Sequence, residues 1–107
     1  MPIPSTYKAW KKLYDSWVAE RPKDVQALLE QFPIWNSYNI DGSSPFDCRV
    51  VGVDEHADGQ LTLRVYVESP TFPRQVFGIK KESLVLTKKS NPETHYSKLR
   101  LAGAFFT

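Results

Sequence analysis

The sequence predicts an α+β protein, with an N-terminal pair of amphipathic helices packed on a four- to five-stranded antiparallel sheet. Three observations predict this class: two helical patterns fill residues 5–32, strand-like alternation follows residue 45, and an Asp-Gly turn joins two strands. The strands form either a meander or a small, partly open SH3-like barrel. The barrel alternative comes from the short strands and the tight connection in residues 79–86, and is an analogy of topology rather than a family match.

The first expected helix covers about residues 6–20, with Ser5 as its N-cap. Apolar and aromatic side chains recur three and four residues apart, which places them on one helical face. These residues are Tyr7, Trp10, Tyr14, Trp17 and Val18. Such a stripe of rings serves either as a core face or as a surface that meets a partner.

The second expected helix begins with Pro22 at its first position and ends before Pro33. Its apolar residues follow the i, i+3, i+4, i+7 pattern and are Val25, Leu28, Leu29 and Phe32. Residues 33–45 are rich in Asn, Ser, Asp and Gly without a clear period, and are expected to form a loop anchored by its aromatic residues.

Antiparallel strands are expected over about residues 46–101. The first two, at 46–56 and 60–69, form a hairpin whose turn contains Asp58-Gly59. Further strands are predicted at 75–80, 84–87 and 95–101, followed by an apolar tail at 102–107.

The chain has 107 residues, a mass of 12.3 kDa and 13% aromatic residues, which suits one globular domain spanning 1–107. The single cysteine, Cys48, allows no internal disulfide and favours a reducing, cytoplasmic location. No signal peptide or membrane span is expected. The net charge of +2 is unevenly distributed: residues 1–12 carry +3, residues 13–73 carry −6 and residues 74–107 carry +5.

Catalytic and metal-binding patterns are weak. The carboxylates and imidazole of residues 54–58 are metal-binding groups, but their spacing fits a solvated hairpin turn better. Cys48 could pair with His56 or His95 for nucleophilic catalysis, yet its strand position points into the core. We therefore expect no catalytic residues, no metal and no cofactor.

The leading functional prediction is a small non-catalytic protein that recognises a protein partner through aromatic anchors. An inhibitor, an immunity-like protein or an accessory subunit fits this description. The expected anchors are Trp10, Trp17, Trp35 and Tyr38.

Two alternatives remain open, while membrane binding is not expected and the oligomeric state is not predicted. A nucleic-acid-binding domain would use the basic C-terminal half, with Tyr66 or Tyr96 stacking on bases. Its contacts would be Arg74, Lys80, Lys81, Lys88, Lys89, Lys98 and Arg100. A small-ligand pocket between helices and sheet would combine aromatic walls with His56 or His95.

Overall fold

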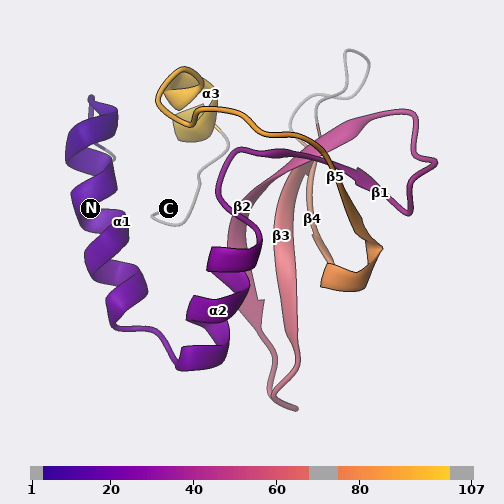
Figure 1. The fold of residues 1–107 in the computed structure, drawn as a ribbon. Helices are drawn as coiled ribbons and strands as arrows, with labels where there is room; N and C mark the ends of the chain where they lie inside the picture. The colour runs from indigo at the N-terminus through magenta and orange to yellow at the C-terminus, as the bar shows by residue number, and fades with distance from the viewer. Residues whose placement is uncertain (1–3, 68–74, 102–107) are drawn as a thin grey trace.

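The computed structural model describes residues 4–67 and 75–101 (Figure 1). The helices are α1 (Tyr7–Ala19), α2 (Lys23–Gln31) and α3 (Tyr96–Leu101), and a single 3-10 turn, η1, spans Lys81–Ser83. The strands are β1 (Ser37–Ile40), β2 (Asp47–Glu55), β3 (Leu61–Val67), β4 (Gln75–Ile79) and β5 (Leu84–Lys88). Two helices precede the sheet, as expected for the α+β class.

The five strands form one antiparallel sheet in the order β4-β3-β2-β1-β5, which is not closed into a barrel. Only residues 80–83 connect the two edge strands. An extended link of this length reaches about 17 Å, whereas a flat five-stranded sheet is about 19 Å across. Because η1 shortens the link further, the sheet must curve so that β4 and β5 approach each other at this end.

The helix starts differ slightly from the prediction. Thr6, not Ser5, caps α1, and its side-chain oxygen accepts a hydrogen bond of 3.3 Å from the Ala9 backbone N–H. Pro22 occupies the N-cap position of α2 rather than the first helical position, and its carbonyl accepts from the Gln26 backbone N–H at 3.0 Å.

Both faces of the sheet carry a hydrophobic core. Adjacent Val50 and Val51 are both fully buried, yet they belong to different clusters because successive side chains of a strand point to opposite faces. The face of Val50, here called the inner face, packs against Leu28 and Phe32 at α2. The outer face, that of Val51, packs against the rings of α1 and against α3 (Figure 1). The two helices of the predicted pair therefore build separate cores.

Two predicted elements are wrong. The expected loop at 33–45 contains β1, which pairs with β2 on one side and β5 on the other, so its polar residues are ordered by long-range hydrogen bonds. The expected strand at 95–101 is instead the helix α3, in which Tyr96 and Leu99 have the i, i+3 spacing of one helical face and pack together in the outer-face cluster. The end of the predicted second strand, at 68–69, and the tail at 102–107 lie outside the described residues.

Candidate recognition surface

The expected aromatic anchors are mostly core residues. Trp10 and Trp35 are 0% exposed and Tyr38 is 3% exposed, while Trp17 is partly buried. A ring with no exposed surface cannot contact a partner in this conformation. Trp10 and Trp35 therefore have a packing role here, whereas Tyr38, although largely buried, also lines a groove beside the end of α2. The sequence pattern does not distinguish packing from recognition.

The rings of α1 stack on one another along the helix and make edge or tilted contacts with Tyr96 of α3. Trp10 lies 5.0 Å from Tyr14 between ring centroids, 6.0 Å from Tyr7 and 6.2 Å from Tyr96. Trp17 stacks on Tyr14 at 6.2 Å, and the Arg21 guanidinium lies 4.8 Å from the Trp17 ring centroid. The stripe seen in the sequence is thus the outer-face core.

Trp35 is held at the junction between α2 and β1 in a backbone conformation with φ of 65°. Its ring stacks on Tyr66 at 6.2 Å, and the Arg49 guanidinium lies 5.5 Å from the ring centroid. The same guanidinium donates to the Trp35 carbonyl at 2.8 Å. These contacts with Tyr66 and Arg49 hold Trp35 in place where the chain enters the sheet.

An open groove runs along α2 on the inner side of the molecule. Its first part encloses about 630 Å³ between α2, the tip of the β2–β3 hairpin and η1. Its second part, of about 450 Å³, continues between the end of α2 and β5. Gln31 and Lys81 line both parts, so we treat them as one feature, the α2 groove.

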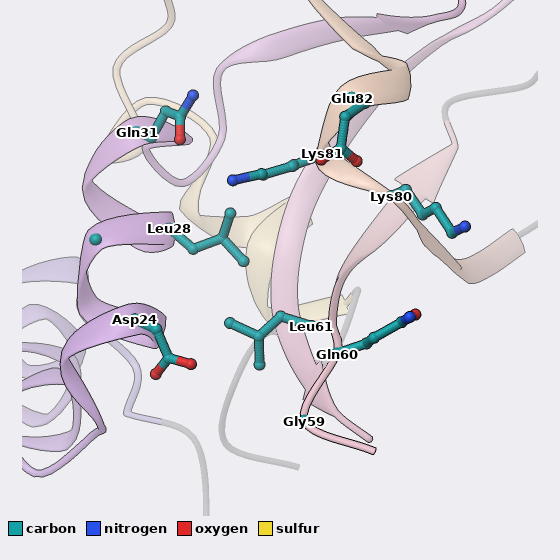
Figure 2. Close-up of a pocket in the computed structure, with 10 residues that line it drawn as sticks. Asp24, Leu28, Gln31, Gly59, Gln60, Leu61, Lys80, Lys81 and Glu82 are labelled. Carbon is teal, nitrogen blue, oxygen red and sulfur yellow. The ribbon is translucent and has the colours of Figure 1, made fainter. Parts of the chain in front are cut away.

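Figure 2 shows the first part of the α2 groove. Leu28 from α2 and Leu61 from the hairpin face each other across it, and Lys81 extends its ammonium toward α2 near Gln31. Glu82 lies beside Lys81, but Lys81 forms no ion pair with any residue in the described parts of the chain. The groove thus offers an apolar floor and an ammonium available to a ligand.

The groove opens at its second end onto an exposed sheet edge. Val85 and Leu86 are each 48% exposed, and Thr87 and Lys88 are exposed as well. Leu86 also lines the groove, so the groove and this edge are continuous. We call residues 85–88 the β5 edge.

The basic residues predicted to contact nucleic acid divide into two groups. Lys80, Lys81, Lys88 and Lys89 flank β5, whereas Lys98 and Arg100 lie on α3. Arg74 lies outside the described residues.

The rings expected to stack on bases are largely committed to the core. Tyr96 is 7% exposed, and Tyr66 is partly buried against Trp35. Carboxylates of Asp24, Glu30 and Glu82 also lie along the groove among its lysines. Phe32 and Tyr38 adjoin Lys81 and Lys89 in the groove, but at 7% and 3% exposure they offer little surface on which a base could stack.

The polar hairpin tip is engaged in local contacts. The Asp54 carboxylate pairs with the Arg64 guanidinium, the His56 Nε2 atom lies 2.9 Å from the Thr62 hydroxyl, and Asp58 accepts from the Gln60 backbone N–H at 3.0 Å. Across residues 4–67 and 75–101, no three His, Cys, Asp or Glu side chains are arranged to hold a metal ion.

Cys48 is fully buried on the inner face, as its strand position predicts. Burial, with a smaller effect from Asp47, raises the pKa of its thiol to about 12, so the nucleophilic thiolate is disfavoured at neutral pH. Neither His56 nor His95 lines the α2 groove, so the histidine-containing pocket considered above is not the one found between helix and sheet.

No sequence pattern considered above predicts that the α2 groove and the β5 edge form one surface. The available signal was the pair of Lys-Lys doublets, at 80–81 and 88–89, that bracket the apolar residues of β5. Charged residues beside an apolar strand mark an exposed edge, but the contribution of α2 depends on tertiary packing.

The chain matches no family model, and comparison with curated proteins and with solved structures returns no match. None of the helices in the described parts of the chain is long and apolar enough to cross a membrane. Function therefore has to be inferred from the residues of this chain and their geometry.

Proposed function

We propose that this protein is a small non-catalytic interaction module that binds a protein partner at the α2 groove and the β5 edge. The observation that carries the proposal is the continuity between a partly apolar groove and a strand edge whose Val85 and Leu86 are half exposed. Exposed apolar side chains surrounded by charged residues are typical of recognition surfaces. An inhibitor, an immunity-like protein or an accessory subunit would use such a surface.

The proposed contacts are mainly aliphatic, and the predicted anchor Tyr38 also lines the groove. Leu28 and Leu61 form the apolar floor of the groove, and Leu86 extends it to the sheet edge. Lysines and carboxylates both line the groove around this floor, and such a polar rim gives specificity. A cytoplasmic location fits the proposal, because the single cysteine is buried and thiol-bearing proteins are common in reducing compartments.

Site-specific photo-crosslinking in cells of the natural source tests the proposal. A photoreactive residue is placed at position 86 and, as a matched control, at Val76, which is 40% exposed on β4. We expect an adduct with a defined protein at position 86 and none at position 76. The identified partner is then purified and its affinity measured by calorimetry.

The calorimetric comparison uses Leu86→Asp and Val76→Asp. Leu86→Asp should weaken partner binding by at least about tenfold, since an apolar contact is replaced by a charge that must be desolvated, and Val76→Asp should change affinity by less than about twofold. Absence of an adduct at position 86, or unchanged affinity of Leu86→Asp, would contradict the proposal.

A further inference from the structure

We infer that the β5 edge binds an extended acidic segment of the partner by strand addition, so that the segment becomes a sixth strand beside β5. This inference rests on the proposed function and assigns its partner a chemistry. Strand addition obtains affinity from main-chain hydrogen bonds and specificity from side chains at alternate positions. The β5 edge supplies both.

The backbone of β5 is available on one side. β5 ends the sheet and pairs only with β1, in the register Tyr38↔Leu86 and Asn39↔Val85. Within the described parts of the chain, residues 85–88 make no backbone hydrogen bond other than those of this ladder. Their outward N–H and C=O groups therefore match the pattern that another extended peptide presents.

The side chains of β5 present one apolar contact on each face. Leu86 lies opposite Tyr38 on the inner face and lines the α2 groove, whereas Val85 lies opposite Asn39 on the outer face. An added strand would place its alternate residues beside these two side chains and cover their exposed surface. The side chains of the added strand that point to the inner face would enter the groove, where the Lys81 ammonium could pair with them.

Charge selects an acidic segment. Residues 80–89 contain four lysines and one glutamate, which gives this ten-residue stretch a net charge of +3. Asp24 and Glu30 of α2 line the same groove, so the excess of positive charge lies at the β5 edge rather than inside the groove. A segment with glutamate or aspartate at alternate positions would place its carboxylates near Lys88 and Lys89 at this edge. Ion pairs at such an edge contribute modestly to affinity but discriminate strongly by sign.

The same charge disfavours a second copy of this chain as the occupant. Pairing of two β5 edges would bring the four lysines of one copy beside those of the other, with only Glu82 of each to offset them. Nucleic acid is also less favoured, because Tyr66 and Tyr96 pack in the outer core, and Phe32 and Tyr38, which line the groove beside the lysines, are only 7% and 3% exposed.

The experiment uses synthetic peptides of about ten residues, a length typical of long strands. One alternates Val with Glu, one alternates Val with Lys, and a third is the Glu peptide with N-methyl groups on alternate residues. Affinity for the full chain is measured by fluorescence anisotropy, and backbone amide exchange is measured with and without each peptide. N-methylation removes main-chain donors without changing charge, so it separates strand addition from simple charge attraction.

We expect the Glu peptide to bind, to slow amide exchange in residues 85–88, and to lose at least about tenfold in affinity when N-methylated. Lys88→Glu/Lys89→Glu should weaken the Glu peptide by at least about tenfold and strengthen the Lys peptide. Lys8→Glu/Lys12→Glu, the same charge change on the exposed side of α1, should alter the Glu peptide's affinity by less than about threefold.

Several results would overturn the inference. Equal binding of the N-methylated peptide, or binding without slower exchange in residues 85–88, would exclude strand addition. Tighter binding of poly-uridine than of the Glu peptide would identify nucleic acid as the anionic ligand, and exchange that slows with protein concentration alone would identify a second copy. Photo-crosslinking at position 86 is independent of the peptide experiments. If a partner protein is crosslinked there and any of these contrary peptide results is also obtained, the proposed function is retained and the addition of an acidic strand is rejected.

Discussion

Truncation of Trp10 separates a structural role of the N-terminal rings from a recognition role. Its indole is 0% exposed and stacks on Tyr14 and Tyr7, at 5.0 and 6.0 Å between ring centroids. Replacing a buried Trp by Ala costs about 3–5 kcal/mol, and each aromatic pair contributes about 0.5–1.5 kcal/mol beyond its buried area. We therefore expect Trp10→Ala to lower the free energy of unfolding by about 4–5 kcal/mol. That is a large share of the roughly 5–15 kcal/mol typical of a domain.

Trp17→Ala is the matched control on the same helix. The Trp17 ring is partly buried, lies 6.2 Å from Tyr14 and is covered by the Arg21 guanidinium at 4.8 Å. Losing the ring contact with Tyr14 and the cation–π contact with Arg21 at a partly solvated site should cost about 1–2 kcal/mol. The less buried ring is thus expected to give the smaller loss of stability.

Urea unfolding followed by far-ultraviolet circular dichroism measures both variants without relying on tryptophan fluorescence. The slope with denaturant should stay constant, so that midpoints report stability. A loss for Trp10→Ala no larger than that for Trp17→Ala would refute the packing role. So would a Trp10→Ala variant that is as stable as the wild type but fails to bind the partner.

Three further predictions concern the helix cap, the hairpin turn and the buried thiol. Thr6→Ala should lower the free energy of unfolding by about 1 kcal/mol, whereas Ser5→Ala should leave it within about 0.3 kcal/mol; equal effects in urea unfolding would contradict the cap assignment. Gly59→Ala should cost about 1–2 kcal/mol because Gly59 has φ of 87°, and an unchanged thermal midpoint would show that the turn relaxes. Because burial raises the pKa of Cys48 from 9.0 to about 12, the unfolded chain loses this proton first as pH rises, and stability falls above about pH 9. Urea unfolding between about pH 8 and 10 should show a steeper decline for wild type than for Cys48→Ala, and parallel curves would exclude this contribution.

Local sequence patterns were sufficient to predict those helices and turns whose structure is determined by their own residues. The three- and four-residue spacing in α1 and α2, and the Asp-Gly turn between β2 and β3, specify elements within a few residues of their observed bounds. The buried position of Cys48 also followed from alternation along its strand. In both helices and in these strands, the residues that the short-range spacing placed on one face are buried or partly buried in the folded structure.

Long-range pairing explains most of what sequence reasoning missed. β1 is polar and short, and it becomes a strand because β2 and β5 supply partners on both sides. The rings of α1 are core residues because α3 and the outer face of the sheet cover them, which no local pattern reveals. The α2 groove joins residues about 60 positions apart in the chain, such as Leu28 and Leu86, so it forms only when α2 packs on the sheet.

A heteronuclear NMR titration of the full chain with the partner captured at position 86 tests whether recognition occurs at the α2 groove and the β5 edge. We expect shifts of the backbone amides of residues 80–89 and of α2, with the indole N–H signals of Trp10 and Trp35 unchanged, because these rings are buried away from the surface. Shifts concentrated at the indole signals and α1, with β5 unaffected, would contradict this expectation and restore the aromatic residues as the recognition site.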